Sequence, residues 1–385
     1  MNQRMTLPRG FRAAGVAAGL KPGGAKDLAL VVNDGPSDAA AAVFTANRCR
    51  AHPVLWSERV IADGRARAIV LNSGGANCYT GPDGFQTTHA TAERVAAGLG
   101  IGASDVLVCS TGLIGERLPR QALLSGVDAA VAALSTDGGA AAAEAVMTTD
   151  TRPKHAVDGG GGWSVSGFAK GAGMLAPALA TMLVVIVTDA AVDRETCDVA
   201  LRAAARLTFD RLDSDGCQST NDTVALLASG ASGITPSLDE FTGVLTRLCH
   251  SLTIQLLADA EGSNHDITIE VTGAACEDDA LEVARAVARS SLFKCAVYGE
   301  DPNWGRVLAA TGTTRAVFDP AGIDVTFNDV RVCQGGQPDD TREKVRFDGR
   351  AVHVGIELHA GRATASVWTN DLTEAYVHEN SVYST

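Results

Sequence analysis

Features that often reveal the class of a protein are scarce in this sequence. Its 385 residues include nine cysteines, which is an odd number, and no two of them form a CxxC pair. This scattered spacing argues against a disulfide framework and against a zinc site, and it fits the reducing cytoplasm. No uninterrupted apolar run reaches the length of a membrane span. We therefore expect a cytoplasmic protein with no membrane partner and no bound metal.

Basic residues are in the minority. Lys and Arg number 32 against 45 Asp and Glu, so the formal net charge is -13. Such a balance argues against binding to nucleic acid or to an anionic membrane surface. Acidic residues are missing before Asp27, a bias that transit peptides share. Because Pro8, Pro22 and several glycines interrupt this stretch without an amphipathic pattern, we expect an ordinary N-terminal strand and turn.

What the chain does contain is an alternation of apolar, strand-like runs with alanine-rich helical stretches. Its length and its 46% hydrophobic residues suit two domains with sizeable cores. The patterns predict helices at 88–99, 121–134, 139–147, 195–209, 237–257 and 278–289, and strands at 28–32, 68–72, 106–110, 163–167, 182–187, 267–272, 352–358 and 363–368. We read 159–162 as a glycine turn and 169–174 as too glycine-rich for a regular element. The mixture predicts an α+β fold, and the alternation alone leaves a doubly wound parallel fold open.

The stretch from Lys170 to Thr181 is the most suggestive of chemistry. It is glycine-rich, reaches Ala180 and Thr181 through Pro177, and continues directly into an apolar run typical of a buried central strand. If the chain were cut after Ala180, the Thr181 hydroxyl would be a nucleophile. The new α-amine, with an ordinary pKa of about 7.7–8.0, would be its general base. Taken alone, however, the segment favours a purely structural turn and strand.

A second segment ends a predicted strand with Thr111 and Gly112. A threonine hydroxyl beside a glycine N–H suits an oxyanion hole, whose donors stabilise the charge that develops on a carbonyl oxygen. Thr-Gly is also an ordinary turn dipeptide, so the pair gains meaning only from its context.

Motifs along nearly the whole chain resemble those of the ornithine acetyltransferase family (glutamate N-acetyltransferase) of the cyclic route of arginine biosynthesis. They include Asn-Ser-Gly-Gly-Ala-Asn at 72–77, Ser-Thr-Gly-Leu-Ile-Gly at 110–115, Met-Thr-Thr-Asp-Thr at 147–151, Ser-Thr-Asn-Asp-Thr at 219–223 and Asp-Pro-Asn-Trp-Gly-Arg at 301–306, together with 43–48, 170–183 and 380–385. Each string is short, but all of them in family order make the resemblance specific.

The resemblance implies an αββα sandwich like that of N-terminal-nucleophile hydrolases, with a second, smaller α/β domain. Self-cleavage between Ala180 and Thr181 would give an α chain of residues 1–180 and a β chain of residues 181–385 that begins with Thr181. The two chains would jointly form the sandwich and the second domain, and they would assemble as a heterotetramer of two α and two β chains.

The resemblance also implies roles for particular residues. Thr181 is the expected nucleophile, and Thr111 and Gly112 are the expected oxyanion hole. The expected substrate-binding residues are Thr149, with Thr148 as the close alternative, Lys170, Thr181, Glu261, Asn380 and Thr385. Lys170 would pair with an α-carboxylate or a developing negative charge, and Glu261 with an ammonium group of ornithine. Without the resemblance, Lys170 reads as a surface residue and Glu261 as a solvated helix end.

The implied reaction is a ping-pong transfer of acetyl from N-acetyl-L-ornithine to L-glutamate through acetyl-Thr181. No cofactor is expected, and the sequence leaves open whether acetyl-CoA is a second donor. After Glu261 and Gly262 the family usually has a threonine and a lysine, whereas this chain has Ser263-Asn264-His265. That departure leaves the acyl-donor preference open. The alternatives are an N-terminal-threonine amidase or aminopeptidase, and a binding protein that never cleaves.

Overall fold

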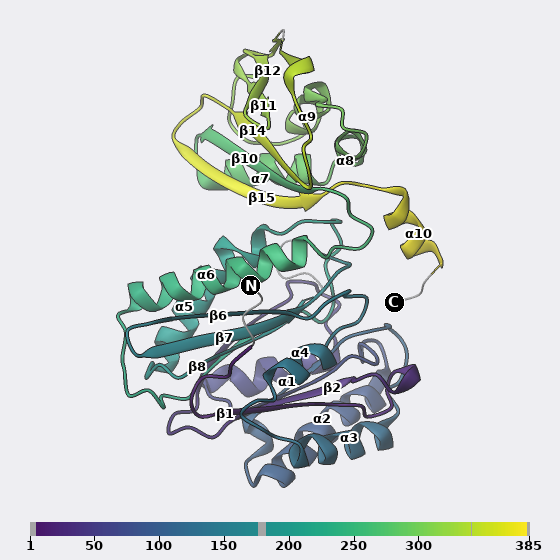
Figure 1. Cartoon of the computed structure of the whole chain (residues 1–385), viewed down its shortest axis with the longest axis vertical. Helices are drawn as coiled ribbons and strands as arrows, with labels where there is room; N and C mark the ends of the chain where they lie inside the picture. The colour runs from purple at the N-terminus through teal and green to yellow at the C-terminus, as the bar shows by residue number, and fades with distance from the viewer. Residues whose placement is uncertain (1–4, 176–181, 340, 383–385) are drawn as a thin grey trace.

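The computed structural model describes residues 5–175, 182–339 and 341–382. Within these residues the chain forms a layered sandwich and, above it in Figure 1, a smaller domain built on a sheet of its own. The candidate residues Ala180, Thr181 and Thr385, and also Pro177, lie outside the described residues. No described helix is long and apolar enough to cross a membrane.

The sandwich is made of two sheets that lie face to face. One has the strand order β1-β2-β4-β5 and the other has the order β3-β9-β8-β7-β6. The strands are β1 (Phe11–Val16), β2 (Leu28–Asn33), β3 (Ala39–Phe44), β4 (Ala68–Asn72), β5 (Val106–Ser110), β6 (Lys154–Gly160), β7 (Trp163–Lys170), β8 (Leu183–Thr188) and β9 (Thr223–Ala228). Along β2, Ala29 and Val31 face the core between the sheets, whereas Leu28 and Leu30 face the outer helices. This period of two is what a strand buried on both faces requires.

Helices cover both outer faces of the sandwich. Leu123 and Val127 of α3 (Arg120–Ala132) and Val95 of α2 (Gly81–Leu99) pack on the first sheet. On the second sheet lie α5 (Arg194–Leu207) and α6 (Leu238–Leu257). The αββα order expected from the sequence is therefore confirmed (Figure 1). Two further helices complete this domain: α1 (His52–Val60), beside β5, and α4 (Gly139–Ala145), against β1 and β2.

The strand directions exclude the doubly wound alternative. Only β4 with β5 and β8 with β9 run parallel among the described strand pairs of the sandwich, and the remaining pairs are antiparallel. A doubly wound fold needs parallel neighbours throughout most of its sheet.

The smaller domain has its own core between a mixed sheet and helices. Its sheet has the order β13-β12-β11-β14-β10-β15. The elements are β10 (Asp266–Ala274), β11 (Asp324–Phe327), β12 (Val330–Gln334), β13 (Gln337–Pro338), β14 (Ala351–Glu357), β15 (Ala363–Asn370), α7 (Glu277–Ala288), α8 (Ser291–Tyr298) and α9 (Trp304–Thr311). A last helix, α10 (Glu374–Val382), leaves this domain and descends toward the sandwich (Figure 1).

Some predicted boundaries are wrong, for identifiable reasons. The expected helix at 88–99 begins at Gly81, because Pro82 favours the first turn of a helix. Gly159 and Gly160 belong to β6 and pair with Ser164 and Trp163, so only the tip of this hairpin is a turn. The strand expected at 163–167 extends to Lys170, because Ala169 and Lys170 pair with β8. Lys170 therefore ends a strand and does not lie in an irregular segment.

Candidate active site

The candidate residues come from strand ends that meet at one side of the sandwich. Lys170 is the last residue of β7 and pairs with Leu183, the first residue of β8. Thr111 directly follows β5 of the opposite sheet. The two sheets bring these residues together, so that Lys170 Nζ donates a hydrogen bond to Thr111 Oγ1 at 3.1 Å.

Every candidate site residue within the described part of the chain lines one small cavity, of about 70 Å³. These residues are Thr111, Gly112, Thr148, Thr149, Lys170, Glu261 and Asn380. Both threonines that the sequence offered as alternatives, Thr148 and Thr149, therefore reach the cavity. Residues separated by most of the chain length converge here.

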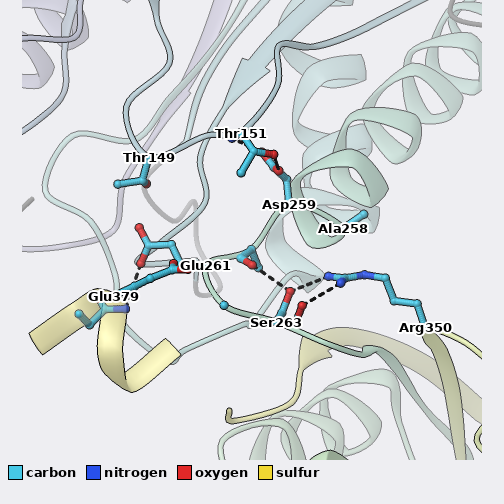
Figure 2. A pocket seen from close by; sticks show the side chains of 11 residues that line it. Thr149, Thr151, Ala258, Asp259, Glu261, Ser263, Arg350 and Glu379 are labelled. Atoms are coloured by element: carbon cyan, nitrogen blue, oxygen red, sulfur yellow. Dashed lines mark hydrogen bonds between the residues drawn. The ribbon is translucent and has the colours of Figure 1, made fainter. Parts of the chain in front are cut away.

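A larger cavity, of about 490 Å³, adjoins the small one and shares Thr149, Glu261 and Asn380 with it. Figure 2 shows the side chain of Arg350 reaching toward Ser263 on one side of this cavity, with Thr149 and Glu261 on the other. Its lining carries charges of both signs, from Asp259, Glu261, Glu379 and Arg350, which suits a small zwitterion better than an apolar ligand.

The turn at Thr111 and Gly112 is held by the loop that follows β4. Gly75 N–H donates to the Thr111 carbonyl at 2.9 Å, and Thr111 N–H donates to the Asn72 carbonyl at 2.9 Å. Gly112 has φ +128°, and a Cβ there would lie 2.7 Å from the Gly75 nitrogen. Among the described residues, the Gly112 N–H has no backbone acceptor. It can therefore donate to an oxygen that enters the cavity.

Lys170 is buried, although the sequence alone would place it at the surface. Its exposed fraction is 1%. Burial lowers the pKa of Lys170 below the ordinary lysine value, and the charge of Asp150 opposes this shift. A second buried ammonium, Lys154, lies in the same region and pairs with Asp150 and Asp259, each at 2.5 Å. The site is thus a region of paired charges shielded from water.

Glu261 connects the cavity to the C-terminal helix. Its own N–H donates to the Ala172 carbonyl at 3.0 Å, which fixes the backbone beside the glycine-rich segment. Its carboxylate accepts a hydrogen bond from Asn380 Nδ2 of α10 at 3.1 Å. Thr373, just before α10, also donates to the Gly262 carbonyl at 2.5 Å. The helix that carries Asn380 is thereby tied to the pocket wall.

The residues that depart from the family pattern do not all face the cavity. Ser263 lines the larger cavity, and its hydroxyl accepts a hydrogen bond from Arg350 at 2.6 Å. The N–H groups of Asn264 and His265 instead donate to Asp371, both at 2.9 Å. The His265 ring contacts the same carboxylate at 2.8 Å, so its contacts support the fold and not the cavity.

Sequence reasoning missed several acidic residues and one lysine of this region: Asp150, Lys154, Asp222 and Asp259. Asp222 is fully buried, and its carboxyl accepts the N–H of Met182, which follows Thr181 in the chain, at 3.0 Å. Burial raises the pKa of Asp222 well above its ordinary value. Asp150 and Asp222 lie inside the quoted motifs at 147–151 and 219–223, and that position was the signal available. No described group of three or more His, Cys, Asp or Glu residues is arranged to hold a metal ion.

Comparison with known proteins finds a family and relatives that match nearly the whole chain. Residues 12–385 match the model of the ArgJ family. A relative from Thermobifida fusca, an "Arginine biosynthesis bifunctional protein ArgJ", is 61% identical over 381 residues, which cover 99% of this chain and 100% of the relative. A protein from Streptomyces clavuligerus named "Arginine biosynthesis bifunctional protein ArgJ 1" is 57% identical, with 99% of each chain covered. A crystal structure of ornithine acetyltransferase from Mycobacterium tuberculosis, complexed with ornithine, is 53% identical. That match has a TM-score of 0.45 and covers 47% of this chain and 97% of the other.

Proposed function

Because the chain belongs to the ArgJ family, we propose that it is the ornithine acetyltransferase of arginine biosynthesis, which moves acetyl from N-acetyl-L-ornithine to L-glutamate. The observation that carries the proposal is the convergence of Thr111, Gly112, Lys170 and Glu261 on one cavity. This cavity offers donors for an oxyanion, a buried cation and a carboxylate. Such groups can stabilise the oxyanion of acyl transfer and bind the charged groups of an amino acid.

The proposed activation step is self-cleavage between Ala180 and Thr181. The Thr181 hydroxyl oxygen attacks the Ala180 carbonyl carbon, the C–N bond breaks, and the proton of the hydroxyl passes to the departing nitrogen. Water then hydrolyses the ester, which leaves a carboxylate on Ala180 and restores the hydroxyl of Thr181. The freed α-amine becomes the base that activates this hydroxyl.

The transfer itself follows a ping-pong order. Thr181 Oγ attacks the acetyl carbon of N-acetylornithine, the amide C–N bond breaks, and ornithine leaves with the proton from the hydroxyl. Glutamate then attacks the acetyl-threonine ester with its amine. The ester C–O bond breaks, and one proton of that amine returns through the Thr181 amine to Oγ. Water must stay out during this second half, because it would compete with glutamate.

Each proposed role has a physical basis in the site. Thr111 Oγ1 accepts a hydrogen bond from Lys170, so its own hydrogen remains available to the acetyl oxygen, beside the Gly112 N–H. Lys170 also places a positive charge near a developing oxyanion or a bound α-carboxylate. Glu261 presents a carboxylate toward the ammonium group of ornithine, where a shielded charge pair is stronger than one at the surface.

The two proposed chains would remain associated after cleavage. Strand β7 precedes the cleavage point and β8 follows it, and the two are hydrogen-bonded neighbours in one sheet. On the other side, β9 pairs with β3, which comes from the first chain. Separating the chains would therefore break this sheet, and we propose that they assemble further as two α and two β chains.

Denaturing mass spectrometry and an acetyl-transfer assay test the proposal. We expect the folded protein to give two species in place of the intact 39.6 kDa chain. The species made of residues 181–385 should begin with Thr181. Thr181→Ala should stay intact and inactive. An intact wild-type chain after long incubation would overturn self-cleavage, and transfer by Thr181→Ala would overturn the nucleophile.

The fate of the acetyl group separates the proposal from its rivals. Acetyl-glutamate formed from N-acetylornithine supports the transferase, whereas free acetate would indicate an amidase or aminopeptidase. Acetyl-CoA supplied in place of N-acetylornithine shows whether it is a second donor, a point of interest because the relatives are named bifunctional.

A further inference from the structure

One buried carboxylate joins the two segments that line the small cavity. Asp150 Oδ1 accepts the N–H of Gly171 at 2.7 Å, and Gly171 directly follows Lys170. Asp150 Oδ2 accepts the N–H of Thr148 at 2.9 Å, and Thr148 directly precedes Thr149. A single side chain therefore sets the spacing between the Lys170 side of the cavity and the threonine side.

Asp150 is itself held in place. Lys154 Nζ bridges Asp150 Oδ1 and Asp259 Oδ2, at 2.5 Å to each. Asp259 in turn accepts the N–H of Thr151 at 3.1 Å. Because both lysine contacts are buried, solvent cannot loosen them as it loosens surface pairs. The carboxylate is fixed from several directions and has little freedom to move.

Burial and the neighbouring charges have opposite effects on the pKa of Asp150. Burial alone would raise the pKa of the Asp150 carboxyl, but the charges of Lys170 and Lys154 and the Gly171 hydrogen bond together bring it below its ordinary value. The charge of Asp150 raises the pKa of Lys170, whereas the charge of Lys154 lowers it. The titratable groups that act on Asp150 or Lys170 are Lys21, Lys154, Asp222 and Glu261, and Asp259 pairs with Lys154.

We propose that Asp150 is a positioning residue for acetyl transfer, which holds the two cavity-lining segments together and supplies the countercharge that Lys170 needs inside the protein. The inference rests on the proposed function, and within it Asp150 does not touch substrate. It acts through Lys170 and through the backbone of Thr148 and Gly171. No role was expected for Asp150 from the sequence.

The pH profile of kcat/KM tests the proposal on the full-length protein. Asp150→Asn preserves the size of the side chain but removes its charge, so Lys170 should lose its proton at lower pH. We expect the alkaline limb of the profile to move down by about one pH unit or more, in keeping with the effect of an opposite charge nearby. A purely structural loss would lower activity at every pH without moving the limb.

A second substitution gives a rescue in the opposite direction. Lys154 repels Lys170, so adding Lys154→Met to Asp150→Asn should move the alkaline limb back toward the wild-type position. Asp189→Asn is the matched control. Asp189 is also buried and also accepts a backbone N–H, from Ser164 at 2.7 Å, but it lies past the opposite end of β8. It should leave the limb unmoved.

The outcomes separate this inference from the proposed function. A wild-type protein that transfers no acetyl overturns the proposed function itself. An active wild type whose alkaline limb is unchanged in Asp150→Asn overturns only the role of Asp150. Should Asp150→Asn fail to fold, Asp150→Glu decides: it keeps the charge but lengthens the side chain that holds Thr148 and Gly171, so it should lower kcat without moving the alkaline limb. A wild-type kcat in that variant contradicts the proposal.

Discussion

Lys170 Nζ, at the end of β7, donates a hydrogen bond of 3.1 Å to Thr111 Oγ1, which belongs to the opposite sheet of the sandwich. An ammonium group can only donate, so the threonine oxygen must accept. The hydroxyl hydrogen of Thr111 is then left for another acceptor. The direction in which this hydroxyl donates is thereby set by a residue from the other sheet.

Removing the Thr111 hydroxyl should reduce turnover sharply. The loss of one donor of an oxyanion hole costs roughly 10²–10³ in kcat, and we expect Thr111→Ala to fall in that range with a smaller change in KM. Thr111→Ser keeps the hydroxyl and should retain most of the activity. Steady-state kinetics of acetyl transfer provide the measurement.

Thr208→Ala is the matched control for that substitution. Thr208 is also buried, but its hydroxyl donates to the Ala204 carbonyl at the end of α5. It should lower stability without lowering kcat. Equal kinetic losses in the two alanine variants would mean that Thr111 acts through folding alone.

The sequence predicted the layers of the fold better than the environment of the site. The apolar runs at 28–32 and 182–187 predict buried strands from local pattern alone, and both strands are present. The burial of Lys170 is different, because its countercharges are Asp150, Asp222 and Glu261, which come from other parts of the chain. No local pattern contains that information, so isolated sequence reasoning places a lysine at the surface.

Glu261 offers a test of substrate recognition. If its carboxylate meets the δ-ammonium of ornithine, Glu261→Gln should raise KM for N-acetylornithine by about ten- to a hundredfold, since hydrogen bonds to charged groups contribute about 1.5–3 kcal/mol. An acetylated donor with a neutral side chain, such as N-acetylnorvaline, serves as the control. Its KM should not respond to the substitution, and an equal rise for both donors would exclude the pairing.

Asp213, which lies outside the cavity, should make the stability of the protein depend on pH. Burial raises the pKa of this carboxyl from 3.8 to about 6, although Arg289 opposes the shift. The folded state therefore holds the proton more tightly than the unfolded state. The stability from this group is complete below pH 4 and is lost as the pH rises through 6.

Asp213→Asn cannot ionise and should escape that loss. Relative to wild type, its free energy of unfolding should rise by about 2 kcal/mol between pH 4 and pH 7, which is most of the change expected from the shift at 1.36 kcal/mol for each unit of pKa. Urea unfolding at a series of pH values measures the difference. A constant offset between the two proteins across this range would show that Asp213 titrates normally in the folded state.

Gly112 and Gly115 form a matched pair that separates backbone strain from steric conflict in the proposed oxyanion hole. Both have positive φ, at +128° and +87°, but an added Cβ at Gly112 would lie 2.7 Å from the Gly75 nitrogen, whereas at Gly115 it would meet no atom within 4 Å. Gly115→Ala should therefore cost only the strain of an unfavourable φ, about 1–3 kcal/mol, and keep kcat close to wild type. Gly112→Ala must in addition displace the loop that holds Thr111, so it should lose more stability. Because the donor N–H of residue 112 also moves, kcat should fall by at least about a hundredfold. Comparing the kcat of the two variants at equal folded fractions separates the loss of the donor N–H from the loss of stability. If both variants turned over equally well, the Gly112 N–H would have no part in stabilising the transition state.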